Sequence, residues 1–212
     1  MSEPLAAAPL RQLFLGIDVS SSVRPYIPEI HFHLTAALER IHQHGPYELA
    51  IYLFNWQVLP FPSEVLAGVR PYPQAFVPTL SDLRRSVAGG TALWDMQDWL
   101  IDEAARHDHP DRRSIILTDG WERSSVRTTL ERLRAKAQHA RDWLDISLVG
   151  FVDARTLQLL AGFAQDLDLP RSAWAFSEHQ NDRGSISESI EQSSLDLVRM
   201  ALRRRGGEGV RN

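Results

Sequence analysis

Residues 13–23 read LFLGIDVSSSV, an apolar run that turns polar at Asp18. The apolar half is continuous rather than alternating, which predicts a β-strand buried on both faces. Asp18, Ser20 and Ser22 follow one another at every second position, where this strand would end and the next helix begin. Ligands of open α/β sheets bind at the carboxyl ends of the strands, so these three oxygen-bearing side chains are expected at a binding crevice. The stretch therefore predicts one half of a metal site.

Strands and helices alternate along the rest of the chain. Apolar runs predict further strands at residues 48–54, 114–118, 145–151 and 172–176, with a short hairpin strand at 57–59. Apolar residues at three- and four-residue steps predict helices at 23–41, 81–87, 93–104, 126–137, 154–165 and 185–204. The fold class expected from this alternation is α/β, a Rossmann-like open and mostly parallel sheet with helices on both faces.

We expect a single domain, because 212 residues suffice for one large core and no internal repeat or linker divides them. The domain is predicted over residues 11–204, between a flexible N-terminal lead-in at 1–10 and a flexible C-terminal tail at 205–212. Five prolines fall within residues 60–80, which predicts a long irregular surface loop. We interpret this loop as a tolerated insertion, since loop length costs little free energy, and a role in partner specificity is the alternative.

Composition excludes several classes of function. The net charge of -4 gives no electrostatic reason to bind nucleic acid or an anionic membrane. The absence of cysteine excludes disulfides, thiolate metal sites and thiol nucleophiles. No apolar run approaches the ~20 residues that span a bilayer, and the first residues lack the basic region of a signal peptide. We therefore expect a cytoplasmic protein.

Two more polar residues fall at predicted strand ends or in adjoining loops. Thr91 follows a pair of glycines, and Asp119 directly follows the predicted strand at 114–118. Together with the spacing Asp18-x-Ser20-x-Ser22, they resemble the metal-ion-dependent adhesion site of von Willebrand factor type A (vWA) domains. Each motif alone is weak evidence, but all three in this order are specific. The resemblance covers about residues 12 to 200, and it departs from the usual pattern in having Ser21 where glycine is frequent.

The resemblance implies a role for each residue of this set. Ser20, Ser22 and Thr91 would ligate a cation directly, and Asp18 and Asp119 would hold it directly or through water. Oxygen ligands without histidine or cysteine favour Mg²⁺, with Mn²⁺ or Ca²⁺ as alternatives, over zinc. Neutral hydroxyl ligands leave the cation electrophilic, so it can accept one more carboxylate from an Asp or Glu of a partner protein.

The function implied is a non-enzymatic, cation-dependent protein-binding module, an adaptor or assembly subunit of an intracellular bacterial complex. MoxR-type AAA ATPases are candidate partners. Two alternatives stay open: a Mg²⁺-dependent phosphatase or phosphotransferase on a similar sheet, and a vWA scaffold with a vestigial metal site. The phosphatase hypothesis requires a second acidic residue at the first strand end, where this chain has Ser20.

For several other residues, an ordinary structural role is considered beside a functional one. Helix capping explains one of the polar residues after the first strand but not the whole set. The histidines at 31, 33, 107 and 109 do not match zinc spacings. Trp94 and Trp121 fit an interface rim or the core equally well. Glu122 and Arg123, which follow Asp119 closely, are expected to be solvated.

Overall fold

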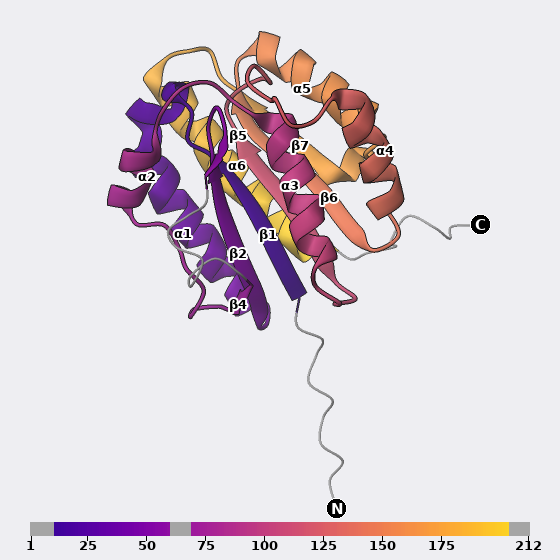
Figure 1. The fold of residues 1–212 in the computed structure, drawn as a ribbon. Coiled ribbons are helices and arrows are strands. Elements are labelled where there is room, and N and C mark those ends of the chain that lie inside the picture. Colours follow the sequence, from indigo (N-terminus) through magenta and orange to yellow (C-terminus); the bar gives the residue numbers. More distant parts are fainter. Residues whose placement is uncertain (1–10, 60–68, 204–212) are drawn as a thin grey trace, which may run out of the picture.

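The computed structural model describes residues 11–59 and 69–203 (Figure 1). The strands are β1 (Arg11–Asp18), β2 (Tyr47–Phe54), β3 (Val58–Leu59), β4 (Arg70–Pro71), β5 (Arg112–Thr118), β6 (Leu144–Val152) and β7 (Trp174–Glu178). The α-helices are α1 (Ile27–Gln43), α2 (Leu80–Ser86), α3 (Leu93–Ala105), α4 (Leu130–Ala140), α5 (Ala154–Asp166) and α6 (Arg183–Leu202). Two 3₁₀ helices, η1 (Ser21–Tyr26) and η2 (Arg171–Ala173), complete the order. No helix among these residues is long and apolar enough to cross a membrane.

The strands form one sheet in the order β3-β2-β1-β5-β6-β7, with β4 also paired to β2. The five longer strands run parallel, whereas β3 and β4 pair with β2 in the antiparallel sense. The predicted hairpin at 57–59 is confirmed by the pairing of Val58 with Phe54. The predicted α/β fold class, an open and mostly parallel sheet with helices on both faces, is confirmed (Figure 1).

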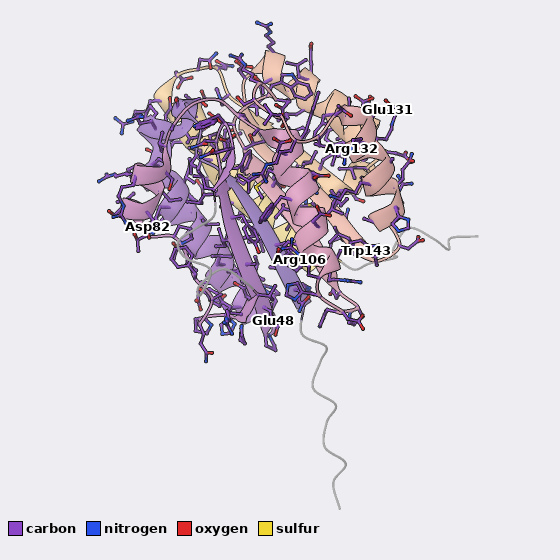
Figure 2. All side chains as sticks on the ribbon, viewed as in Figure 1. Glu48, Asp82, Arg106, Glu131, Arg132 and Trp143 are labelled. Carbon is purple, nitrogen blue, oxygen red and sulfur yellow. The ribbon has the colours of Figure 1, made fainter. Side chains whose placement is uncertain are left out.

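Side chains of β1 alternate between two apolar cores. Leu13, Leu15 and Ile17 point into the core shared with α1 and α6, whereas Phe14 belongs to the core beneath α3, α4 and α5. This explains why the strand reads as a continuous apolar run, since helices cover both of its faces. Most charged side chains lie on the outer surface, as Glu131 on α4 illustrates (Figure 2).

Three predicted helix starts are wrong. The helix predicted from residue 126 begins at Leu130, because the Thr129 hydroxyl accepts a hydrogen bond from the backbone N–H three residues later and caps it. Asp182 caps α6 in the same way, so the capping box predicted at Ser185 does not start this helix. α2 is capped by Thr79 rather than by Ser81.

Part of the proline-rich segment is ordered against the sheet. Residues 60–68 lie outside the described part of the chain, as do the predicted lead-in, the predicted tail and residue 204. Arg70 and Pro71 pair with β2, and the ring of Tyr72 stacks on that of Tyr47 with centroids 5.1 Å apart. The prediction of an irregular surface loop is therefore wrong for residues 70–72.

A buried arginine joins the last helix to the sheet at the amino ends of the strands. Arg113 of β5 is only 2% exposed, and its Nε donates to Asp111 Oδ1 at 2.8 Å. Its Nη1 donates to the carbonyl oxygen of Met200, near the end of α6, at 3.1 Å. The guanidinium thus holds the carboxyl end of α6 in place.

Replacing this guanidinium should lower stability. We expect Arg113→Met to reduce the free energy of unfolding by about 2 to 3 kcal/mol, because it removes hydrogen bonds made by a buried charged donor. Arg134→Met is the control: its ion pair with Asp166 is exposed, and its loss should cost less than about 1 kcal/mol. Urea denaturation measures both. Equal losses in the two variants would contradict the anchoring role of Arg113.

Candidate metal centre

The five predicted site residues come together at the carboxyl ends of β1 and β5. Asp18 ends β1, Ser20 and Ser22 lie in the turn into η1, and Asp119 directly follows β5. Thr91 precedes α3. β2, the next strand along the chain, lies on one side of β1, and β5 lies on the other side. The strand order therefore reverses between β1 and β5, and open α/β folds bind ligands at such a switch point.

Hydrogen bonds connect these side chains. Ser22 Oγ donates to Asp119 Oδ1 at 3.0 Å, and Ser20 Oγ lies 3.0 Å from Ser22 Oγ. Thr91 Oγ1 lies 3.5 Å from Asp18 Oδ2. The structure therefore brings all five predicted residues into one cluster, and their role as metal ligands stays a prediction.

A cavity of about 460 Å³ opens above this cluster. Ser20, Ser22, Thr91 and Asp119 line it, whereas Asp18 lies beneath its floor and is 2% exposed. Trp121 packs on the core next to α5 and also lines the cavity, and its role at an interface stays a prediction.

Thr118 is a residue of this cluster that the sequence interpretation missed. Its hydroxyl donates to Asp18 Oδ2 at 2.6 Å and accepts the backbone N–H of Gly120 at 3.1 Å. The backbone N–H of Ser20 donates to the other oxygen, Asp18 Oδ1, at 2.8 Å. Both oxygens of Asp18 are thus oriented by this chain. The available signal was a polar residue at the end of an otherwise apolar strand.

The two carboxyl groups stand in an unusual electrostatic environment. Burial raises the pKa of Asp18, against the lowering effect of its hydrogen bonds with Thr118 and Ser20. Burial and the neighbouring Asp18 carboxylate raise the pKa of Asp119 to about 7. Neither group forms an ion pair with a basic side chain in the described part of the chain. Two adjacent acids without a basic partner, surrounded by hydroxyls, fit a hard divalent cation.

The described residues offer no competing site of the zinc type. Over 11–59 and 69–203, no group of three or more histidine, cysteine, aspartate or glutamate side chains could hold a metal ion. The candidate centre contains only two such groups, Asp18 and Asp119, and its other donors are hydroxyls. The five candidate ligands therefore offer oxygen donors alone, while Asp153 and His179 also line the cavity.

A carboxylate fastens the loop after β5 to the start of α3. Glu122 Oε1 accepts the backbone N–H groups of Ser124 and Ser125, at 2.7 and 2.6 Å. Its Oε2 accepts the backbone N–H of Trp94 at 2.8 Å. The prediction that Glu122 is solvated is therefore wrong, since its carboxylate caps an N-terminus that no local side chain caps.

A carboxylate of α3 also binds the loop after β5, in the opposite direction. Asp95, which is 4% exposed, accepts the backbone N–H groups of Val126, Arg127 and Thr128 at 2.9 to 3.2 Å. The segment that follows Asp119 and the segment that follows Thr91 are thus held together by two carboxylates. This fixes the separation of two candidate ligands that lie far apart in sequence.

Gly120 leaves room for the cluster. A Cβ atom at this position would lie 2.8 Å from Thr91 Oγ1 and 3.8 Å from Asp18 Oδ2. We expect Gly120→Ala to weaken Mg²⁺ binding at least tenfold, because the methyl group displaces Thr91 while every candidate ligand is kept. Gly162→Ala is the matched control, since a Cβ there meets nothing within 4 Å. Calorimetric titration measures both affinities, and equal affinities would exclude this crowding.

The raised pKa of Asp119 predicts a pH-dependent stability in cation-free buffer. A carboxyl group whose pKa is near 7 in the folded protein and 3.8 in the unfolded chain favours the folded state only while it is protonated. This contribution is complete below the unfolded pKa and is lost as pH rises through about 7. In EDTA, Asp119→Asn should therefore gain stability relative to the wild-type protein between pH 5 and pH 8. Urea denaturation across this range measures the difference, and a constant difference would contradict the prediction.

Comparisons with known proteins identify the fold. No protein-family model and no curated protein matches the chain. It superposes on a von Willebrand factor type A protein from Catenulispora acidiphila with a TM-score of 0.56 and 17% identity, over 91% of this chain and 43% of that one. For the PilB minor pilin from Streptococcus sanguinis, the TM-score is 0.61 and the identity 7%, over 93% and 63% of the two chains. For BatB from Bacteroides thetaiotaomicron, the values are 0.53 and 12%, over 90% and 98%.

The chain spans less than two thirds of the length of the first two of these structures. At such low identities, the likeness concerns the fold alone. The chain has the α/β fold of vWA-domain proteins, as the resemblance implied.

Proposed function

We propose that this chain is a non-enzymatic protein-binding module that requires a divalent cation, Mg²⁺ or alternatively Mn²⁺ or Ca²⁺. An Asp or Glu carboxylate of a partner protein would complete the coordination of the cation. The observation that carries the proposal is the convergence of two carboxyl groups and three hydroxyls beside one open cavity, where neither carboxyl group has a basic partner among residues 11–59 and 69–203. MoxR-type AAA ATPases stay candidate partners through the family resemblance.

Each residue of the cluster has a role in this proposal. Ser20, Ser22 and Thr91 are the direct ligands, and Asp18 and Asp119 hold the cation directly or through water. The bound cation supplies a coordination position for an anionic oxygen of the partner. Thr118 and the N–H of Ser20 orient Asp18, and the Glu122 and Asp95 carboxylates hold the loops that carry the other ligands.

The environment of Asp18 argues against the phosphatase alternative. A carboxylate nucleophile must reach its substrate, but Asp18 is 2% exposed and both its oxygens accept hydrogen bonds from this chain. Ser20 occupies the position where such enzymes carry a second acid. Hydrolysis of an aryl phosphate that disappears in Asp18→Ala would overturn this part of the proposal.

Direct titration with Mg²⁺ and Mn²⁺ tests the cation requirement. We expect Asp119→Ala to weaken binding at least tenfold, which corresponds to about 1.4 kcal/mol, with an unchanged circular dichroism spectrum. Ser21→Ala is the control, because Ser21 is exposed and stands between two candidate ligands. An unaltered cation affinity in Asp119→Ala would contradict the proposed metal centre.

Dependence of partner binding on the cation is a separate test. A pull-down from native cell extract is run with Mg²⁺ and with EDTA, and Ser22→Ala and Asp119→Ala are run beside the wild-type protein. A partner retained by the wild-type protein only in Mg²⁺, and lost in both variants, supports the proposal. Equal retention in EDTA would place the binding face elsewhere and favour the vestigial-site alternative.

A further inference from the structure

Two large apolar side chains are exposed on the loops around the candidate metal centre. Among the described residues, the exposed large hydrophobic side chains are Phe32, Trp56, Val126, Leu159 and Leu195. Phe32, Leu159 and Leu195 lie singly on α1, α5 and α6. Trp56 and Val126, which are 51% and 87% exposed, instead lie in loops at the carboxyl ends of the strands.

The backbone that carries Val126 is held rigidly although its side chain buries almost nothing. Its N–H donates to Asp95 Oδ2 at 2.9 Å, and the next two N–H groups donate to the same carboxylate. Burial in the fold therefore does not account for this valine. A fixed apolar side chain loses little entropy when a partner covers it, which is the property of an interface anchor.

Trp56 is presented in a similar way. The neighbouring Asn55 is 2% exposed, and its Nδ2 donates to the carbonyl oxygen of Ser86 at 3.0 Å. The Asn55 Oδ1 accepts the N–H of Gln57 at 3.1 Å, so both flanks of Trp56 are fixed. These hydrogen bonds thus fix the backbone that carries the half-exposed indole.

A pair of glycines connects these anchors to the metal centre. Gly89 has a φ of +58°, and a Cβ atom on it would lie 2.3 Å from Trp56 Cδ1. A Cβ atom on Gly90 would lie 2.6 Å from Ser124 Oγ, two residues before Val126. Both glycines also line the cavity above the candidate ligands. The indole, the glycine floor and the loop that carries Val126 therefore form one continuous surface.

Two arginines bring positive charge to this surface. Arg123 lines the cavity and is exposed. Arg127 is exposed in the same loop, and neither arginine forms an ion pair within the described residues. Glu122 and Asp95, in the same region, accept hydrogen bonds with both oxygens. Asp153 also lines the cavity, and its Oδ1 accepts the backbone N–H of Thr156 at 2.7 Å. Although the whole chain carries a net charge of -4, this face offers guanidinium groups to a partner.

We propose that Trp56, Val126 and Arg123 form a docking surface for an acidic protein segment that carries apolar residues beside its metal-binding carboxylate. The inference rests on the proposed function and specifies the chemistry of the partner. The carboxylate occupies the metal centre, a flanking acid pairs with Arg123, and flanking apolar side chains cover the indole and the valine. Electrostatic complementarity of this kind speeds encounter, and the apolar anchors slow dissociation.

The test uses a phage-displayed library of twelve-residue peptides with a fixed central Asp. The library is selected on the immobilised wild-type protein in MgCl₂, and the enriched peptides are synthesised. Their affinities are measured for the wild-type protein in MgCl₂ and in EDTA, and for Val126→Ser, Trp56→Ala and Arg123→Gln. Phe32→Ser is the matched control, since Phe32 is 67% exposed on α1. The Mg²⁺ affinity of every variant is titrated in parallel.

We expect the enriched peptides to carry acidic and apolar residues around the central Asp and to require Mg²⁺. Their affinity should fall at least tenfold in Val126→Ser and in Arg123→Gln, but less than twofold in Phe32→Ser. The Mg²⁺ affinity should be unchanged in Val126→Ser and in Phe32→Ser, and Arg123→Gln adds no carboxylate that could bind the cation itself. Val126→Ser keeps the test decisive if Trp56→Ala disturbs the neighbouring Gly89, because the valine side chain is 87% exposed.

The results distinguish a failure of the docking surface from a failure of the proposed function. Mg²⁺-dependent peptides that bind the docking-surface variants as well as the wild-type protein would overturn the docking surface and leave the proposed function standing. Peptides that bind equally in EDTA, or no enrichment in MgCl₂, would contradict the proposed function and the docking surface together.

Discussion

The buried carboxylate of Asp18 is the constraint on which the functional end of this molecule depends. Ending β1 with an acid under the floor of a cavity is unfavourable by itself, because burial penalises the charged form. The Thr118 hydroxyl from the adjacent strand and the backbone N–H of Ser20 from the following turn stabilise the carboxylate by donating hydrogen bonds to it. These two donors fasten β1, β5 and the first loop to one another at the switch point of the sheet, and a cation above them would offset the remaining charge.

The rigidity of the surrounding loops follows from two further carboxylates. Asp95 and Glu122 each accept several backbone N–H groups, and each reaches across from one metal loop to the other. A site built from three separate segments needs such support, because its ligands must be in place before a partner binds. The same support holds Val126 outward, so the geometry of the metal centre and that of the docking surface have one structural origin.

The fold and the place of the five candidate ligands in it could be predicted from the sequence because their signals are local. Continuous apolar runs mark strands covered on both faces, and polar residues just beyond them mark the carboxyl edge of the sheet. The supporting residues could not be predicted in this way. Glu122 reaches back to Trp94, 28 positions earlier, and Thr118 reaches Asp18 across 100 positions, so only the fold itself brings these partners together.

The wrong helix starts have a physical reason as well. The apolar spacing that begins at Val126 suits a helix, but the buried Asp95 carboxylate takes the N–H groups of this segment and leaves the helix to start at Leu130. Similarly, the stacking of Tyr72 on Tyr47 orders part of a segment that its prolines mark as irregular. In both cases a long-range contact overrides a local preference.

The most direct measurement is a crystal structure of the protein grown with Mn²⁺, with anomalous scattering recorded to locate the ion. We expect one strong anomalous peak beside Ser20 Oγ, Ser22 Oγ and Thr91 Oγ1, at the floor of the cavity. A cavity without an anomalous peak at saturating Mn²⁺, or a peak held by other residues, would contradict the metal centre on which the proposed function rests.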